Sequence, residues 1–465
     1  MNSNSNSKKL IVGTGIYAVG TFGTKILMFL IAPLYTYYLV TAEMGTYDVL
    51  ISTIGLLIPV ISLQISDAVY RWIIRDDIDS AAYLRITYQF LLFSSVIAAG
   101  IILIVNCIIP IPYAYFFFAA LFSALIFQTN QKILRGLKKQ WLFVISGIVY
   151  TCVFLAFNII QLCVLHKGVE SLFVSYIVAN MVGFLTIVIF EKQTRMNLFK
   201  KPDIPKLKEL LRFSVPLIPN YLSWWVIDSS DRYIVLFALG VSSNGVLAIA
   251  HKFPTILQSV FGLFLNSWQD MAIATDQDEK EFFTSVFKKL YKFSFLMLFA
   301  LIPVTKLFVM LVMNTDYKMA CDYIPFYYLG AVFQSFCSFW GVGYLRSKNT
   351  KGSFTSSVYA ALINAAVNIA VIRFVGLHAA AISTFVAFFI MWLIRVKHNK
   401  MNLGITIEWK LFIPLLIADI AVCILSILFG VYVNCILSVV GILLFVFLCK
   451  NDVLLLLKML KKRKS

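Results

Sequence analysis

The stretch LFIPLLIADIAVCILSILFGVYVNCILSVVGILLFVFLC, residues 411 to 449, is largely apolar, and Asp419 is its only charged side chain. As one continuous helix it would be roughly 58 Å long, about twice the thickness of the hydrocarbon core of a membrane. One crossing needs only about 20 helical residues. The stretch therefore predicts two transmembrane helices that form a hairpin.

The same pattern extends along the whole chain. Its 465 residues are 60% hydrophobic and 13% charged, whereas soluble domains average about 45–50% and 25%. Clusters of Lys and Arg separate seven apolar stretches, each long enough for a hairpin, so we predict an all-α polytopic membrane protein with fourteen spans. The predicted spans are residues 10–39, 44–67, 86–109, 112–133, 141–165, 169–190, 213–239, 243–267, 292–312, 323–345, 353–374, 377–395, 411–430 and 432–449.

The basic residues predict the orientation of the chain in the membrane. The net charge is +18, from 40 Lys and Arg against 22 Asp and Glu. Because cytoplasmic loops are enriched in Lys and Arg, we place all basic clusters and both termini on the cytoplasmic side of the membrane. The net charge then reflects topology, and no nucleic-acid partner is expected. The polar start MNSNSNSKK has no cleavage site after it, so we expect the first span to be retained.

The longest polar connection, EKQTRMNLFKKPDIPKLKELLR at residues 191 to 212, divides the spans into two groups of six. A shift of 200 residues places LVTAEMG (39–45) over LGVSSNG (239–245), which suggests two repeated halves, as in many transporters. The predicted parts are a six-helix bundle at 1–190, a basic cytoplasmic linker at 191–212, a second six-helix bundle at 213–395, and two extra helices with a basic tail at 396–465.

No sequence motif indicates an enzyme or a bound cofactor. The eight Cys residues have no CxxC spacing, and the four His residues are dispersed. HExxH, GxSxG and P-loop patterns are absent from the sequence. We therefore expect no metal and no cofactor beyond a coupling proton or sodium ion.

The apolar stretch YLSWWVIDSSDRYIVLFALG, residues 221 to 240, contains the charged residues Asp228, Asp231 and Arg232. Counted from its outer end, Arg232 is roughly 10 Å deep and Asp228 roughly 16 Å. A charge at such a depth costs about 2.5–3.5 kcal/mol against lipid, so we expect these side chains to face protein or water. Asn220 and Trp224 share a helix face with the two aspartates.

Other polar side chains lie in the spans that correspond to this one. His251 and Lys252 are in span 8, and Lys25 is in the inner half of span 1. At the inner end of span 2, one helix face is predicted to form an inner rim. The residues of this rim are Gln64, Asp67 and Arg71. Spans 1, 2, 7 and 8 are thus predicted to line a cationic, water-accessible cavity for an anionic group.

Some of these charges also have structural interpretations. Asp228 and Arg232 are i,i+4 neighbours with the acid first, which favours a helix-stabilising pair. Asp67 and Arg71 could equally form an interfacial ion pair.

Further charged residues lie outside the predicted cationic set. Lys306 is close enough to the outer surface for its side chain to snorkel to water, so we expect no transport role for it. The candidates for a coupling ion are Asp48, Asp228, Asp231 and Asp419, with packing or interfacial roles favoured for Asp48 and Asp419.

Three motifs resemble the multidrug/oligosaccharidyl-lipid/polysaccharide superfamily, specifically polysaccharide biosynthesis (Wzx-type) flippases of O-antigen, capsule and exopolysaccharide repeat units. The motifs are LVTAEMGTYDVL after span 1, LLRFSVPLIPNYLSWWVIDSSDRYIV at the start of the second half, and LGVSSNGVLAIAHKFPTIL entering span 8. The resemblance implies a V-shaped carrier with a central cavity. Such a carrier moves an undecaprenyl-diphosphate-linked oligosaccharide to the outer leaflet by alternating access.

The resemblance also implies roles for particular residues. Arg232, Lys252 and Lys25 match positions that would face the diphosphate, whereas Asp67 stands where a small residue is expected. A polysaccharide polymerase and glycosyltransferases of the same pathway are the implied protein partners. Multidrug efflux within the superfamily is the main alternative, and a membrane glycosyltransferase or polymerase is disfavoured by the short outer loops.

Overall fold

The computed structural model describes residues 23–74, 80–192, 201–274, 280–347 and 349–462. Nearly all of these residues are helical, and none of them lies in a β-strand. The polar start of the chain and residues 10–22 of predicted span 1 lie outside the described residues; residues 23–30 of that span are helical.

The chain divides into two compact units, Met1–Tyr233 and Ile234–Ser465. The boundary lies inside one long helix, α10, whereas the predicted second bundle begins at residue 213. The grouping of the spans as six, six and two stays a prediction.

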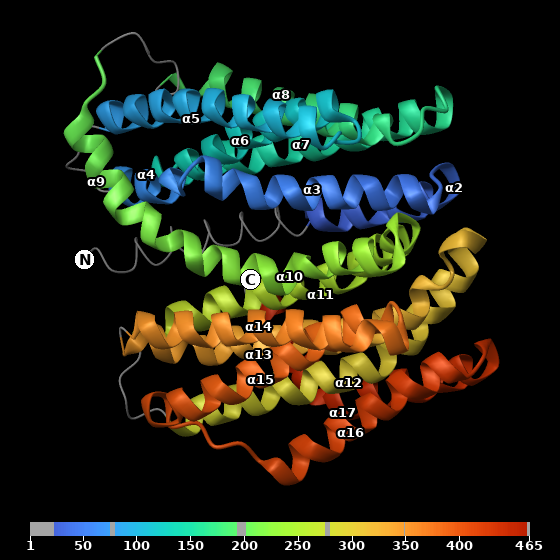
Figure 1. The fold of residues 1–465 in the computed structure, drawn as a ribbon. Coiled ribbons are helices and arrows are strands. Elements are labelled where there is room, and N and C mark those ends of the chain that lie inside the picture. Colours follow the sequence, from blue (N-terminus) through green and yellow to red (C-terminus); the bar gives the residue numbers. More distant parts are fainter. Residues whose placement is uncertain (1–22, 75–79, 193–200, 275–279, 348, 463–465) are drawn as a thin grey trace. The chain divides into compact units, whose positions relative to one another are not determined.

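The described helices of the first unit are drawn in blue to green in Figure 1. They are α2 (Ala32–Tyr38), α3 (Thr41–Ile61), α4 (Ile65–Ile73), α5 (Ser80–Ile108), α6 (Ala114–Gly136), α7 (Gln140–Ile159), α8 (Glu170–Phe190), α9 (Ile204–Ser214) and α10 (Ile218–Leu239), the last of which continues into the second unit.

The helices of the second unit follow in green to red. They are α11 (Val241–Ala274), α12 (Lys280–Val312), α13 (Ala320–Arg346), α14 (Thr350–Val375), α15 (His378–Leu403), α16 (Trp409–Leu428) and α17 (Val431–Lys462).

Within the described residues, ten helices are long and apolar enough to cross a membrane. In α5 and α17, only 17% of the residues in the 18-residue apolar segment are buried inside the protein, so most of these apolar side chains lie on the outer surface. Helices suit this setting because all their central backbone groups are hydrogen-bonded internally. The prediction of an all-α, polytopic membrane protein is confirmed. Where the structure describes the predicted spans they are largely helical, with a break inside span 2, and the count of fourteen crossings stays a prediction.

The predicted end of span 2 is wrong. We expected one helix over residues 44–67, but α3 ends at Ile61, and Leu63 and Gln64 adopt left-handed backbone conformations with φ of 46° and 55°. Two successive left-handed residues cannot continue a right-handed helix. The chain therefore breaks there and restarts as α4.

The linker contains a helix that the sequence interpretation treated only as a polar connection. The Asp203 side chain accepts a hydrogen bond from the backbone N–H of Lys206, and Pro205 occupies the first turn of α9. Both residues favour a helix start at this point. α9 packs against α4 and α5, across their ends in Figure 1.

Aromatic rings form much of the core of the second unit. Phe333 on α13 and Trp392 on α15 meet at 5.4 Å between ring centroids, and Trp392 stacks on Phe412 of α16 at 5.0 Å. All three side chains are buried. Large rings bury much apolar surface, so this cluster joins α13, α15 and α16 into one body.

Candidate functional site

The predicted polar stretch of span 7 lies on α10, and Arg232 is at its centre. The Arg232 Nε donates to the Asp48 carboxylate of α3 at 2.7 Å, and its Nη1 lies 3.3 Å from the Asp231 carboxylate. Asp231 is fully buried and Arg232 is 9% exposed. Desolvated charges are costly unless paired, so this ion cluster accounts for a charge inside an apolar helix.

The predicted side-chain pair between Asp228 and Arg232 is wrong in its detail. Arg232 donates to the backbone carbonyl of Asp228 at 2.7 Å, while the Asp228 side chain is exposed. The carboxylates that pair with Arg232 include Asp48, which we expected to have a packing, interfacial or ion-coupling role, and Asp231.

Two further hydrogen bonds join α3 to α10 in the first unit. The Trp225 indole N–H donates to the Ser52 carbonyl at 3.1 Å, and the Tyr233 and Thr53 hydroxyls are 2.6 Å apart. With the Asp48–Arg232 pair they form what we name the α3–α10 polar seam: Asp48, Ser52 and Thr53 of α3 with Trp225, Arg232 and Tyr233 of α10. The sequence interpretation missed Trp225 and Tyr233, although both are polar-tipped aromatics near the charged stretch.

The residues predicted to share a face with the aspartates divide between two environments. Asn220 and Asp228 are exposed and Trp224 is half-buried, so these three follow one face of α10. Asp231 turns into the protein. This face of α10 is therefore polar between Asn220 and Asp228.

The inner-rim residues lie at and along α4 and take separate partners. Asp67 forms an ion pair with Lys132 of α6 at 2.6 Å. Arg71 places its guanidinium 4.4 Å from the centroid of the Phe213 ring. The alternative of an Asp67–Arg71 ion pair is thus replaced by two interactions with other helices. Gln64 is buried at the start of α4.

The remaining predicted cations are in different surroundings. Lys25 is exposed on helical residues 23–30 of the first unit. His251 and Lys252 are half-buried on α11 of the second unit, where the His251 ring lies 4.1 Å from that of Tyr327. The convergence of Lys25, Arg232 and Lys252 on one cavity stays a prediction.

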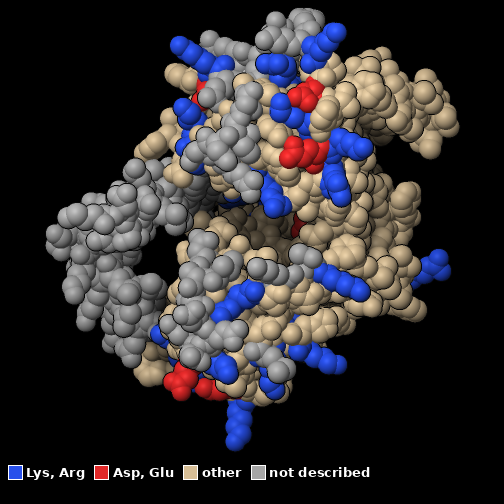
Figure 2. Space-filling model, turned by 90° about the vertical axis from the view of Figure 1, so that its left-hand side faces the viewer, with Lys and Arg blue, Asp and Glu red and all other residues tan. Residues whose placement is uncertain are grey.

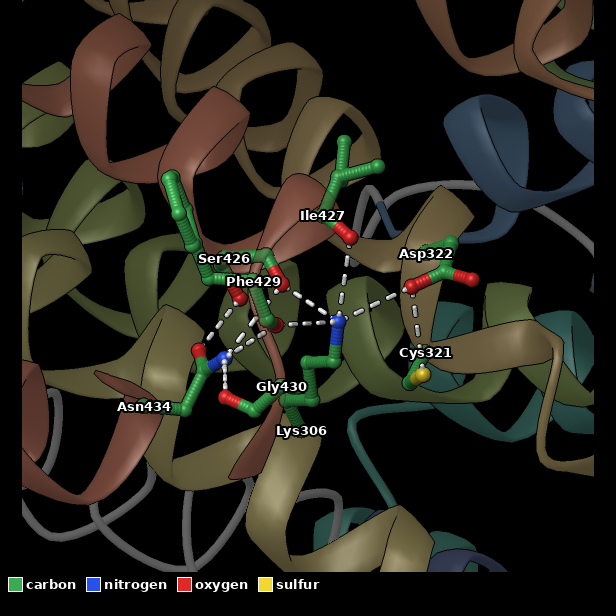
Figure 3. Close-up of polar contacts among 8 residues, drawn as sticks. All are labelled: Lys306, Cys321, Asp322, Ser426, Ile427, Phe429, Gly430 and Asn434. Atoms are coloured by element: carbon green, nitrogen blue, oxygen red, sulfur yellow. Dashed lines mark hydrogen bonds and ion pairs between the residues drawn. The ribbon is translucent and has the colours of Figure 1, made fainter. Parts of the chain in front are cut away.

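Lys306 is buried, contrary to the expectation that its side chain snorkels to the outer surface. It is 5% exposed, and its ammonium lies 3.1 Å from the Asp322 carboxylate of α13. It also donates to the carbonyls of Ser426, Ile427 and Phe429 at the end of α16 (Figure 3). Helix C-termini carry partial negative charge and unbonded carbonyls, so Lys306 acts as a cap for α16.

Asn434 of α17 completes this cap, which the sequence interpretation did not find. Its amide donates to the carbonyls of Ser426, Phe429 and Gly430, and the Ser426 hydroxyl donates to its side-chain oxygen at 2.7 Å. Figure 3 shows Lys306 and Asn434 on the two sides of the same chain end. This arrangement joins α12, α13, α16 and α17 and supports a structural role.

Asp419 is buried in α16, and one of its carboxylate oxygens has no hydrogen-bond partner among the described residues. Within the same described residues, no group of three or more His, Cys, Asp and Glu side chains has the arrangement of a metal site. Whether Asp419 carries a coupling ion or has the favoured packing role stays a prediction.

A model of the family described as polysaccharide biosynthesis protein matches residues 10–269, more than half of the chain. The chain belongs to the polysaccharide biosynthesis protein family. Its fold is similar to "Lipid II flippase MurJ, inward closed conformation", with a TM-score of 0.71 and 17% identity over 94% of this chain and 99% of that one. No curated protein matches it.

Two MATE structures share the fold with lower TM-scores. An outward-facing multidrug resistance MATE family transporter of the MOP superfamily matches with a TM-score of 0.57 and 14% identity, over 84% of this chain and 95% of that one. A MATE in complex with MaL6 matches at 0.56 and 15%, over 85% and 96%. At 14–17% identity, these three likenesses show that the chain shares its fold with a lipid II flippase and with MATE transporters.

Proposed function

We propose that the protein flips an undecaprenyl-diphosphate-linked oligosaccharide, a polysaccharide repeat unit, across the bacterial cytoplasmic membrane by alternating access. The observation that carries this proposal is the family match over residues 10–269. The likeness of the fold to a lipid II flippase agrees with it. Both termini would lie in the cytoplasm, and the polymerase and glycosyltransferases of the pathway would supply and use the substrate.

The charge of the proposed substrate explains why the cationic residues would be needed. A diphosphate carries at least two negative charges, and its transfer through hydrocarbon is prohibitive without compensating charges. Arg232, Lys252 and Lys25 are the cations proposed to meet it. The exposed polar face of Asn220, Trp224 and Asp228 would contact sugars, while the polyprenyl chain stays in lipid.

The α3–α10 polar seam suggests how an ion could be coupled to this step. In the structure Arg232 is held by Asp48 and Asp231. A proton or sodium ion on either carboxylate would weaken that hold and release the guanidinium toward the diphosphate. Substrate and coupling ion would then favour the same state of Arg232.

The proposal is tested in cells that depend on this protein, by measuring surface polysaccharide together with lipid-linked oligosaccharide in the cytoplasmic leaflet. The variants are Arg232→Ala, Arg232→Lys and the control Arg373→Ala, which removes an exposed Arg from the last turn of α14. Protein levels in the membrane are matched. The double variant Arg232→Ala with Asp48→Asn shows whether any loss comes only from an unpaired carboxylate.

We expect Arg232→Ala to abolish surface polysaccharide and accumulate the precursor, with partial function in Arg232→Lys and normal function in Arg373→Ala. Normal transport by Arg232→Ala would exclude Arg232 from the substrate path. No precursor accumulation when the protein itself is depleted would exclude the flippase function.

Multidrug efflux is the second candidate, favoured by the likeness to MATE folds and by two carboxylates at Arg232. It predicts that loss of the protein sensitises cells to cationic drugs while surface polysaccharide remains normal.

A further inference from the structure

One face of α9 is exposed and combines apolar with basic side chains. The face lines an open groove with a volume of about 490 Å³. Its residues follow the i, i+3, i+4, i+7, i+8 spacing of a single helix stripe. They are Ile204, Leu207, Lys208, Leu211 and Arg212. Ile204 is 57% exposed, Lys208 and Arg212 are exposed, and Leu207 and Leu211 are half-buried, so the described part of the chain leaves much of this stripe uncovered.

The opposite face holds α9 against the first unit. Leu210 and Ser214 are fully buried. The Glu209 carboxylate accepts hydrogen bonds from the Trp72 indole N–H at 2.7 Å and from the Tyr83 hydroxyl at 2.8 Å. Both donors are polar-tipped aromatics, the residue type enriched at membrane surfaces.

The position of Tyr83 sets the depth of α9. Tyr83 is in the first turn of α5, a helix that is long and apolar enough to cross a membrane from Ser80 to Ile108. A helix bonded to the first turn of a span lies where that span leaves the hydrocarbon. α9 therefore lies at the level of the lipid head groups, with its exposed stripe facing outward from the unit.

The surroundings of the stripe are basic. A second groove, of about 590 Å³, is lined by Trp72, Pro205, Lys208, Glu209, Arg212 and Phe213. The Arg71 guanidinium over the Phe213 ring adds a third cation at its edge. Figure 2 looks onto the end where α9 lies in Figure 1 and shows many Lys and Arg side chains gathered there.

We propose that α9 is a binding site for the head group of an anionic phospholipid. Lys208 and Arg212 contact the phosphate, while Ile204, Leu207 and Leu211 enter the boundary of the acyl chains. A soluble anion would use the cations alone, whereas apolar side chains interleaved with cations on one helix face match a charged lipid surface. The site is distinct from the α3–α10 polar seam and does not depend on the transported substrate.

The test is the rate of backbone hydrogen exchange in α9 of the full protein in nanodiscs. One set contains phosphatidylcholine alone, and the other contains equal parts of phosphatidylcholine and phosphatidylglycerol. A third sample adds inorganic phosphate to the phosphatidylcholine nanodiscs. The variant is Lys208→Gln with Arg212→Gln. Its matched control is Lys397→Gln with Lys400→Gln, two exposed lysines of α15.

We expect phosphatidylglycerol to slow exchange in α9 by up to roughly 30-fold, the factor for two basic residues at about 1 kcal/mol each. The α9 variant should lose this effect, and the α15 control should keep it. Equal exchange in both lipids, an unchanged effect in the α9 variant, or the same protection by inorganic phosphate would each overturn the proposal.

Discussion

At the scale of single residues, the main finding is that the deep charges are held by partners far away in the sequence. Arg232 bonds Asp48, 184 residues earlier, and Lys306 bonds carbonyls about 120 residues later. Helical spacing could predict that Arg232 needs a partner but not which helix supplies it. Helical spacing therefore led us to pair Arg232 with Asp228 at i−4. It could reveal neither the ion pair with Asp48 nor the cap of α16.

The Asp48–Arg232 pair should contribute more to stability than an exposed pair of the same length. We expect Asp48→Asn to lower the free energy of unfolding by about 1–3 kcal/mol, because it leaves a desolvated guanidinium with one fewer carboxylate. The double variant with Arg232→Gln should lose less than the sum of the two single variants. Thermal unfolding in detergent measures both.

The control for this comparison is Asp67→Asn. Lys132 and Asp67 are 2.6 Å apart, close to the 2.7 Å of the Asp48–Arg232 pair, but their side chains are 38% and 36% exposed, so the pair contributes about 0–1 kcal/mol. Equal losses for Asp48→Asn and Asp67→Asn would contradict the structural role of the α3–α10 polar seam.

Lys306 offers a second comparison, within one helix. Lys306→Met should lower the free energy of unfolding by about 3–5 kcal/mol, since it leaves Asp322 and the last carbonyls of α16 without their cation. Lys288 is on the same helix, α12, and forms an ion pair with Glu408 in which the two side chains are 43% and 51% exposed. Lys288→Met removes this pair and should lower the free energy of unfolding by at most about 1 kcal/mol. Similar unfolding midpoints for the two variants would argue against the cap.

At the scale of helices, the apolar runs predicted the positions of the spans because a helix of about 20 apolar residues matches the thickness of the hydrocarbon core. The sequence did not reveal the break between α3 and α4, since side-chain pattern continues through Leu63 and Gln64 while only the backbone reverses. It also left α9 unrecognised: eleven residues with many charges form a helix here because Asp203 caps it and α4 and α5 pack against it.

The start of α9 should depend on pH. The Lys206 ammonium, which bonds the Asp203 carboxylate at 2.7 Å, lowers the pKa of that carboxyl below its usual value. A lowered pKa stabilises the helix above the ordinary pKa of about 3.9, and this contribution is lost as the pH falls through the lower, folded value. Hydrogen exchange of the α9 amides, corrected for intrinsic rates, should therefore speed up below about pH 4.

Two variants separate the charge of Asp203 from its capping geometry. Asp203→Asn keeps a good cap and should remove most of the pH dependence. Asp203→Ala should loosen the first turn of α9 at every pH. An unchanged pH profile in Asp203→Asn would show that another group titrates.

At the scale of the whole chain, the basic residues give an orientation that labelling can test. Single cysteines replace Lys201 and Lys288 on the predicted inner side and Asp316 and Arg373 on the predicted outer side, in a background without the native cysteines. A membrane-impermeant thiol reagent added to intact cells should label the last two only. Labelling of position 201 from outside would reverse the assignment of both termini.

The cap of α16 also bears on how the chain enters the membrane during synthesis. α12 emerges from the ribosome long before α16, so the carbonyls that finally hold Lys306 do not yet exist when it reaches the translocon. Asp322 lies only 16 residues later on α13 and can neutralise the ammonium as soon as these two helices insert together. We therefore expect α12 and α13 to be inserted as a pair, with Asp322 as the first partner of Lys306 and the α16 carbonyls added when the last hairpin is inserted.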